Sequence, residues 1–500
     1  MTAYEALEQT FRRLNALREA AGVLHWDMSA MMPKGGAEAR SEQLSALELT
    51  CHELLSGAET AGLLDQAEAG AETLDPWRRA NLREMRRTWR HETALEPGLV
   101  EALTKAQHRC EMAWREARPA SDFAAVLPLF TALLELVRES AAAKAQVFGC
   151  APYDALLDQF EPGGSAARIE AIFADIAAFL PGFLDEVLAR QAARPAPRAP
   201  EGPFPIDRQE ALARRLMRGV GFDFEHGRLD VSLHPFCGGV PDDVRITTRY
   251  DEADFTGALM GVLHETGHAM YERGLPPEWR FQPVGAAGGM ALHESQSLIV
   301  EMQACRSPEF AGYLAPLARE AFGGDGEEGA PAWEAENLVR LMTRVAPGFI
   351  RVDADEVTYP AHIILRTRLE RAMIAGDLAP ADLPGAWNEG MTELLGLAVP
   401  EDRLGCLQDI HWYDGAWGYF PTYTLGAMAA AQLFAAAKAA VPEIPDAIGR
   451  GDFAPLMAWL KDKVHAQGAR YTTDELLEQA TGKPLDPEVF KAHLKTRYLG

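Results

Sequence analysis

Residues 261–270 read GVLHETGHAM, and this stretch decides both the fold expected around it and the chemistry that it carries. Its apolar residues recur at helical spacing, and His264 and His268 lie four positions apart. Side chains four apart share one face of an α-helix, so both imidazoles can bind a single metal ion. Glu265, directly after the first histidine, can take a proton from a metal-bound water. The stretch therefore predicts a helix with a zinc-type metal site and Glu265 as general base.

The H-E-x-x-H pattern also arises by chance, in about a few per cent of chains with this histidine content, and it then usually marks a solvated helix face. Two features of the neighbouring sequence argue against that interpretation. The pattern lies within an apolar helical stretch, and a strand-like segment comes shortly before it. This context favours a metal site.

A catalytic zinc site needs a third protein ligand and an open fourth position. No H-x-x-G-x-x-H follows His268, which disfavours a site of three histidines. Glu294 opens a later helical stretch, and a helix that returns antiparallel to the first one can present this carboxylate to the metal. The alternative is an ordinary acid at a helix N-terminus, favoured there by the helix dipole. The spacing favours the ligand.

One strand stands out, because residues 243–250 (DVRITTRY) alternate in the manner of a β-strand. If this strand borders the cleft, its edge can hydrogen-bond to the backbone of an extended peptide. A lone strand more often has only a structural role, so this hypothesis depends on its position just ahead of the metal helix.

Helical periodicity dominates the rest of the chain. Residues 1–190 are predicted to be helical, and five prolines within residues 194–205 predict an exposed loop or linker. Residues 206–500 contain the strand and the metal-binding stretch. The expected fold class is mainly α, with a small β-sheet beside the H-E-x-x-H helix.

Composition limits the partners and the location. The 48 Lys+Arg and 73 Asp+Glu give a net charge of −25, which repels nucleic acid phosphates and anionic membrane surfaces. Six scattered cysteines without a C-x-x-C pair, and an N-terminal helix pattern without an apolar signal core, predict a cytoplasmic protein. The most apolar stretch, residues 422–441, carries Gln432 and Lys438 and is expected to be a buried helix. We therefore expect neither a nucleic acid nor a membrane as partner.

Several residues are candidates for substrate binding. Removal of a C-terminal residue requires a cation that pairs with the free carboxylate, and the guanidinium fork of Arg351 or Arg245 suits two carboxylate oxygens. A surface salt bridge is an equally good explanation for either arginine. Tyrosine hydroxyls can donate to the oxyanion of a tetrahedral intermediate. The other candidates, which lie in clusters of polar and aromatic residues that a core histidine or a structural turn would also explain, are His234, His411, Tyr419 and Tyr423.

Taken together, these segments resemble the carboxypeptidase Taq family of metallocarboxypeptidases, whose six motifs all occur here in the family's order. An N-terminal stretch, LHWD at 24–27 followed by MPKGGAEAR at 32–40, is also similar to that family, so the resemblance covers essentially the whole chain. The six motifs are His234-Pro235-Phe236, Asp243-x-Arg245-x-Thr247, His264-Glu265-x-x-His268, His293-Glu294-Ser295-Gln296, Ile350-Arg351-x-x-Ala354-Asp355 and Gly405-x-x-Gln408-Asp409-x-His411-Trp412.

The resemblance implies one saddle-like, mainly helical catalytic unit over residues 1–500, in which 1–190 forms a wall of a deep groove and 206–500 carries the metal site. It implies a homodimer that removes C-terminal residues from peptides with broad specificity, but poorly at proline. It also implies that Glu294 is the third ligand, that Arg351 binds the substrate carboxylate ahead of Arg245, and that Zn²⁺ is the metal, with Co²⁺ able to substitute.

Two other functions compete with this one. A related oligopeptide endopeptidase would use the same metal site and groove, but it would also cleave peptides whose C-termini are amidated. A helical scaffold without catalysis would need no intact ligands and no intact base, and here both are present.

Overall fold

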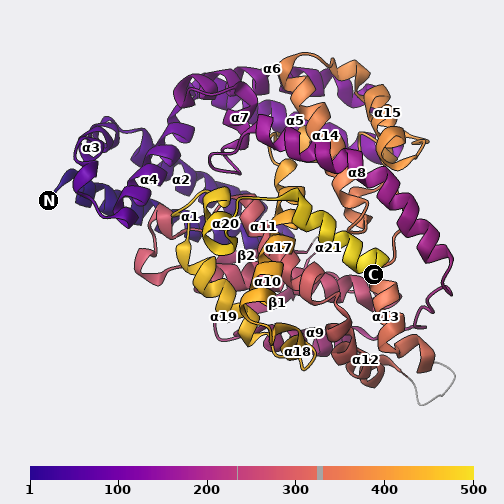
Figure 1. Cartoon of the computed structure of the whole chain (residues 1–500). Helices are drawn as coiled ribbons and strands as arrows, with labels where there is room; N and C mark the ends of the chain where they lie inside the picture. Colours follow the sequence, from indigo (N-terminus) through magenta and orange to yellow (C-terminus); the bar gives the residue numbers. More distant parts are fainter. Residues whose placement is uncertain (233–234, 324–329) are drawn as a thin grey trace. The chain divides into compact units, whose positions relative to one another are not determined.

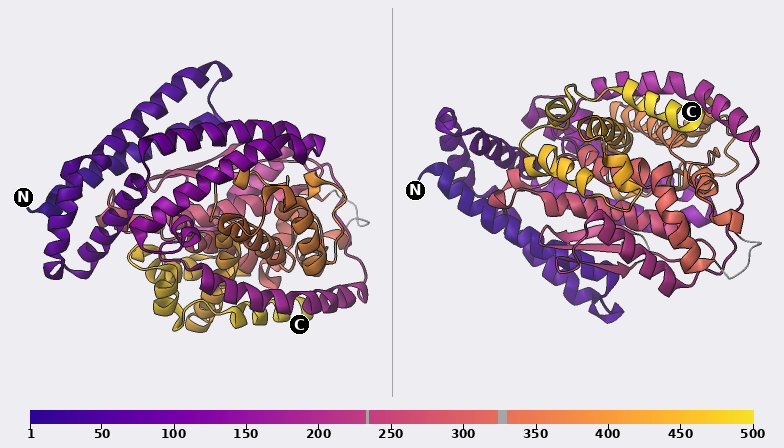
Figure 2. Two further views of the ribbon diagram at one scale, coloured as in Figure 1. Left: turned by 90° about the horizontal axis from the view of Figure 1, so that it is seen from above. Right: turned by 60° about the horizontal axis from the view of Figure 1, so that its bottom comes forward.

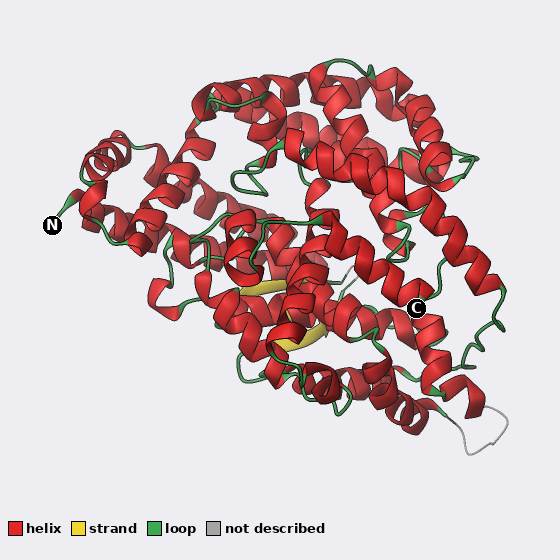
Figure 3. Ribbon diagram, viewed as in Figure 1, coloured by secondary structure: helices red, strands yellow, loops and turns green. Residues whose placement is uncertain are grey.

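The computed structural model describes residues 1–232, 235–323 and 330–500, so the substrate-binding candidate His234 lies outside the described residues. Helices make up most of these ranges, and the strands within them form one three-stranded sheet (Figures 1 and 3). The predicted fold class, mainly α with a small sheet beside the H-E-x-x-H helix, is confirmed. Within the described ranges, no helix is both long enough and apolar enough to cross a membrane.

The chain forms two compact units. The first contains residues 1–89, 196–343 and 426–486, and the second contains 90–195, 344–425 and 487–500. One boundary falls in the predicted proline-rich loop. The prediction of a single catalytic unit over residues 1–500, divided into 1–190 and 206–500, stays a prediction.

The first unit carries the sheet and most of its helices are long. Its strands are β1 (Gly227–Val231), β2 (Phe236–Val240) and β3 (Asp243–Thr248). Its helices are α1 (Ala3–Ala30), α2 (Ala37–Ser56), α3 (Ala58–Ala69), α4 (Pro76–Thr93, which ends in the second unit), α9 (Ile206–Val220), α10 (Phe255–Gly274), α11 (Met290–Leu298), α12 (Pro308–Phe322), α13 (Ala335–Met342), α17 (Pro421–Ala440, which begins in the second unit), α18 (Ile444–Ile448), α19 (Ala454–Lys463) and α20 (Thr473–Thr481). Figure 2 shows α1 and α2, in indigo, side by side as a hairpin.

In its described residues the second unit is helical. It consists of α5 (Pro97–Ala120), α6 (Phe123–Phe148), α7 (Pro152–Leu157), α8 (Ala166–Ala192), α14 (Tyr359–Ala375), α15 (Leu383–Leu395), α16 (His411–Asp414) and α21 (Pro487–Leu499). The last helix is tied to the segment before α14 by one buried acid. Glu356 accepts hydrogen bonds from His493 at 2.8 Å, from Arg497 at 3.0 Å and from the Tyr498 hydroxyl at 3.0 Å.

Helix α10 begins where its sequence provides a cap. The carboxylate of Asp254 accepts hydrogen bonds from the backbone N–H groups of Thr256 and Gly257, which have no partner inside the helix. The helix then packs closely on α11 at Gly267. A Cβ atom there would lie 2.5 Å from the carbonyl oxygen of Gln296, so only glycine allows this approach.

The sheet has the order β1-β3-β2, with β3 parallel to β1 and antiparallel to β2. The predicted strand is present, but it is the central one. Its two edges are occupied by neighbouring strands, so the hypothesis that its own edge binds a peptide is wrong. Within the described residues, β2 pairs with β3 on one side and with no strand on the other.

Candidate metal centre

The two histidines of α10 and the first acid of α11 come together. Nε2 of His268 lies 3.5 Å from Oε2 of Glu294, and Nε2 of His264 lies 3.9 Å from the same oxygen. One ligand atom from each of these residues lies within 4.8 Å of the others, and no second such group of three occurs among the described residues. Two imidazoles and one carboxylate are the donor set of catalytic zinc sites with an open position. These residues therefore fit a divalent metal.

Close helix packing holds Glu294 in place. At Gly426, on α17, a Cβ atom would lie 2.8 Å from Cβ of Glu294 and 3.0 Å from the carbonyl oxygen of Ala291. The hydroxyl of Ser297 donates to the carbonyl of Glu294 at 2.6 Å. Glycines at 267 and 426 thus let three helices approach closely enough to bring the ligands together.

A second carboxylate contacts the other nitrogen of His264. Oε2 of Glu301 lies 3.0 Å from Nδ1 of His264, and Oε1 of Glu301 accepts a hydrogen bond of 2.6 Å from Arg306. Arg306 also donates to the backbone carbonyl of Met342 at 3.0 Å. Glu301 lies in a π-helical turn (η5, Ile299–Ala304) that continues α11. In contrast, Nδ1 of His268 is buried and has no hydrogen-bond partner within the described ranges.

Burial and neighbouring charges perturb two acids of the centre in opposite directions. Burial raises the pKa of Glu265 to about 7, with help from the nearby Glu294 and against the effect of His264. Burial also acts to raise the pKa of Glu294, but the imidazoles of His264 and His268 outweigh it and lower this pKa to about 2. Glu294 is therefore an ionised ligand, and Glu265 can change its protonation state near neutral pH.

The sheet anchors Glu265. Its side chain is 8% exposed, and the backbone N–H of Cys237, in β2, donates to its carboxylate. The predicted general base therefore lies between the metal ligands of α10 and the edge of β2 that has no neighbouring strand.

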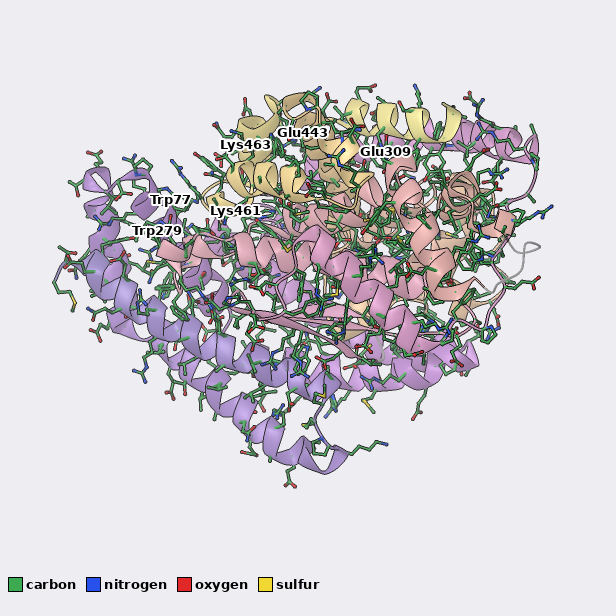
Figure 4. All side chains as sticks on the ribbon, turned by 90° about the horizontal axis from the view of Figure 1, so that it is seen from below. Trp77, Trp279, Glu309, Glu443, Lys461 and Lys463 are labelled. Carbon is green, nitrogen blue, oxygen red and sulfur yellow. The ribbon has the colours of Figure 1, made fainter. Side chains whose placement is uncertain are left out.

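A cleft of about 740 Å³ opens beside the metal centre within the first unit. At the metal end it is lined by His293 and Glu272, and Nε2 of His293 lies 2.9 Å from Oε1 of Glu272. The ring centroids of His293 and His268 are 4.6 Å apart. Gly239 of β2 and Lys461 of α19 line it as well. Trp279 lies in the sequence between the cleft residues Pro277 and Arg280. Its ring stacks on Trp77 of α4, with ring centroids 5.6 Å apart (Figure 4).

Three predicted substrate-binding residues meet in the second unit. Arg351 is 6% exposed, and its Nη2 donates to Asp409 at 2.8 Å. The Arg351 guanidinium lies 4.9 Å from the ring of Tyr423, whose hydroxyl lies 3.2 Å from Nε2 of His411. Asp409 also pairs with the buried Arg366 at 2.6 Å. Burial acts to raise the pKa of Asp409, but Arg366 and Arg351 hold it well below its usual range.

Arg245 has a different environment. Its guanidinium pairs with Asp243 and lies 4.6 Å from the ring of Trp26, which Arg228 contacts as well, at 5.2 Å. Arg245 is not among the residues that line the cleft, and neither are Arg351, His411 and Tyr423. The structure therefore places this second arginine candidate in a stacked ion pair between the sheet and α1.

The sequence interpretation missed Glu301, Arg306 and Glu272. Two of them left a signal. Glu301 follows Glu294 by seven positions, and Glu272 follows His268 by four, so helical periodicity places each on the same face as a metal ligand. Arg306 left none, because its contact with Met342 depends on the tertiary fold.

Known proteins share both sequence and fold with this chain. The family model described as carboxypeptidase Taq (M32) metallopeptidase matches residues 6–498. Thermostable carboxypeptidase 1 of Thermus thermophilus is 37% identical over 99% of this chain and 98% of its own length. The structure of Trypanosoma cruzi metallocarboxypeptidase 1 superposes with a TM-score of 0.96 at 42% identity, covering 100% of this chain and 99% of that one. The structure of the M32 carboxypeptidase of Deinococcus radiodurans superposes with a TM-score of 0.92 at 35% identity, covering 99% of this chain and 98% of that one.

Proposed function

Because the chain belongs to the carboxypeptidase Taq (M32) family, and is therefore a metal-dependent carboxypeptidase, we propose how its own residues carry out the reaction. His264, His268 and Glu294 hold the metal, and Glu265 is the general base. The observation that carries this proposal is the convergence of three ligand atoms within 4.8 Å beside a buried carboxylate. The substrates are peptides with a free C-terminus.

We propose zinc as the metal, with cobalt able to replace it. A divalent ion bound by two imidazoles and a carboxylate polarises the scissile carbonyl and lowers the pKa of the attacking water. The ionised state of Glu294 supports metal binding, because metal ligands must be deprotonated, and the set of two imidazoles and one carboxylate supports zinc. Metal analysis of protein purified without added metal, followed by removal with a chelator and readdition of Zn²⁺ or Co²⁺, tests the identity.

Glu265 moves the proton in this mechanism. Its carboxylate takes a proton from the attacking water and then donates it to the nitrogen of the departing amino acid. Burial supports the role, because desolvation raises the pKa of Glu265 in the metal-free site and makes its carboxylate a stronger base than an exposed one. The hydrogen bond from the Cys237 backbone keeps the carboxylate in position between the two events.

Arg351 is our choice for the substrate carboxylate. Two guanidinium groups, Arg351 and Arg366, share the single carboxylate of Asp409, so these three side chains sum to one positive charge. A buried cluster with an unbalanced positive charge attracts an anionic group. His411 and Tyr423 adjoin the cluster and supply hydrogen-bonding groups. Arg245 is second, because its ion pair with Asp243 has no net charge, whereas the Arg351 cluster has one positive charge in excess.

The free edge of β2 is our candidate for holding the peptide backbone. Glu265 engages the N–H of Cys237, which points away from β3, so only the carbonyl of that residue, which a strand directs to the same side, is left to accept a hydrogen bond from the peptide. Gly239, two residues later, lines the cleft. Backbone pairing is indifferent to side chains, which supports the broad specificity that we propose. Proline lacks the N–H that such pairing uses, which supports poor activity at proline.

A peptide mixture tests the function. Peptides with blocked N-termini and either free or amidated C-termini are incubated with metal-loaded protein and with a chelated control, and the products are identified by mass spectrometry. We expect metal-dependent loss of single residues from free C-termini only. Internal cleavage of both sets would instead indicate an endopeptidase, and absence of cleavage by metal-loaded protein would contradict the proposal.

We further propose a homodimer, on the basis of the family resemblance, and a cytoplasmic location, on the basis of the scattered cysteines. Light scattering coupled to size-exclusion chromatography measures the mass of the assembly. A mass of one chain, 54.7 kDa, across the micromolar concentration range would contradict the dimer.

A further inference from the structure

The two histidines of the metal centre differ in what their outer nitrogens contact. Nδ1 of His264 lies 3.0 Å from the carboxylate of Glu301, whereas Nδ1 of His268 has no hydrogen-bond partner in the described part of the chain. A neutral imidazole carries one proton, and that proton resides on the nitrogen that faces an acceptor. Metal binding requires a neutral His264. Contact with Glu301 then places its one proton on Nδ1 and leaves the lone pair of Nε2, the nitrogen nearest Glu294, for the metal.

Glu301 is itself fixed on its other side. Its second oxygen accepts a hydrogen bond of 2.6 Å from Arg306, and Arg306 donates to the carbonyl of Met342, the last residue of α13. The chain of contacts thus runs from the C-terminus of α13 through Arg306 and Glu301 to His264. A carboxylate that is paired in this way stays ionised and cannot rotate freely, so it can act as a fixed acceptor.

The backbone under Glu301 is unusual as well. Residues 299–304 form a π-helical turn within the described helix, and such turns are rare and often occur at functional sites. This turn follows α11 directly, so one continuous helical segment carries both the ligand Glu294 and the acceptor Glu301. Glu301 is buried, and a buried charge is retained only where it is paired.

We propose that Glu301 is a positioning residue that fixes the orientation and tautomer of His264, and that Arg306 holds Glu301 in place for this task. The proposal rests on the ligand set proposed above. Residues in this outer position typically change metal affinity 10- to 100-fold when they are replaced. The alternative is that Glu301 and Arg306 form an ion pair that only stabilises the fold.

Zinc affinity separates these two roles. We would measure the zinc dissociation constant of the full-length protein by competition with a chromophoric chelator, and the melting temperature of the metal-free protein. In Glu301→Gln the amide cannot accept hydrogen bonds from both His264 and Arg306, so we expect zinc binding to be about 10- to 100-fold weaker. Glu301→Asp keeps the charge at a shorter reach and is expected to recover part of the affinity.

The second unit offers a matched control. Glu356 is also a buried acid held by a histidine and an arginine, His493 and Arg497, but none of these belongs to the proposed ligand set. Glu356→Gln therefore removes an equivalent ion pair and is expected to lower the melting temperature while leaving zinc affinity within about threefold of the parent protein. A purely structural role of Glu301 predicts that Glu301→Gln behaves in the same way.

The outcomes are distinct. His264→Ala must abolish tight zinc binding; if it does not, the proposed ligand set is wrong, whatever Glu301 does. If His264→Ala abolishes binding while Glu301→Gln binds zinc as tightly as the parent protein, the positioning role is overturned. If Glu301→Gln does not fold, Glu301→Asp decides, because unchanged affinity in that variant also contradicts the proposal.

Discussion

Gly267 of α10 lies against Gln296 of α11, so closely that a Cβ atom on Gly267 would be 2.5 Å from the Gln296 carbonyl oxygen. Gly267 directly precedes the proposed ligand His268, and Gln296 follows the proposed ligand Glu294 by two positions. The close packing of α10 on α11 therefore also determines how the ligands of the two helices are positioned relative to one another. A side chain at position 267 must push the helices apart, and the ligands move with them.

We expect Gly267→Ala to destabilise the protein by about 1–3 kcal/mol through overpacking and to weaken zinc binding. Gly261, on the same helix, is the matched control, because nothing lies within 4 Å of a Cβ atom placed there. Gly261→Ala is expected to leave zinc binding unchanged and to stabilise the helix by up to about 1 kcal/mol. Thermal unfolding and chelator competition measure both variants. Equal behaviour of the two would show that the close approach is unimportant.

We expect Glu265→Gln to retain bound metal and to lose most of its activity. Glutamine has nearly the shape of glutamate, and Glu265 is not one of the converging ligands, but an amide cannot take a proton from water. General-base catalysis contributes about 10²–10⁴-fold in rate. Metal analysis measures the bound metal of the variant, and the turnover of a blocked dipeptide measures its activity. Activity near that of the parent protein would remove Glu265 from the mechanism.

Replacement of Arg351 and replacement of Arg245 are expected to lower the activity on free C-termini to different degrees. Arg351→Met should lower kcat/KM for free C-termini by about 100-fold, which corresponds to ~2.7 kcal/mol. Arg245→Met should lower it by less than about tenfold, because Asp243 balances the charge of that guanidinium. Circular dichroism of both variants controls for folding. A larger loss in Arg245→Met would reverse the assignment.

Stability should depend on pH through Glu356. Burial acts to raise its pKa, but Arg497 and His493 outweigh burial and hold the pKa well below the usual 4.5. A carboxyl whose pKa is lowered by folding contributes stability above its unfolded pKa and loses it as pH falls through the folded value. We expect Glu356→Gln to cost about 3 kcal/mol at pH 7, and the difference from the parent protein to shrink below about pH 4.5. Urea unfolding at several pH values measures it; a constant difference would contradict the charge argument.

The features that the sequence predicted are those that depend on local spacing. His264, Glu265 and His268 lie within five consecutive residues of one helix, so 3.6-residue periodicity alone places them together. The prediction of Glu294 as a ligand required the further assumption that a later helix packs antiparallel to the first. In the structure, Gly267 and Gly426 allow the close helix packing that brings Glu294 to the histidines. These contacts join residues distant in sequence, so local spacing could not predict them. Glu301 was open to the same helical reasoning and was missed.

The sheet shows where local spacing is insufficient. β3 alternates clearly, but β1 reads GRLDV and β2 reads FCGGV, and neither has the alternation that marks a strand. Their pairing with β3 therefore left no local signal, and the position of β3 in the centre could not be predicted. Arg245 illustrates the consequence, because its partner Trp26 comes from a helix more than two hundred residues earlier.

The edge of β2 leads to a prediction about substrates. If the peptide backbone pairs with the free edge beside Cys237 and Gly239, N-methylation of the first amide on the N-terminal side of the scissile bond removes a donor that this pairing uses. One hydrogen bond contributes about 0.5–1.5 kcal/mol, so kcat/KM should fall by roughly tenfold. The control substrate carries the additional methyl group on the side chain of the same residue, where it adds equal bulk and leaves the N–H intact. An equal loss with both substrates would indicate a steric effect and would contradict pairing with β2, whereas a loss confined to the N-methyl peptide supports it.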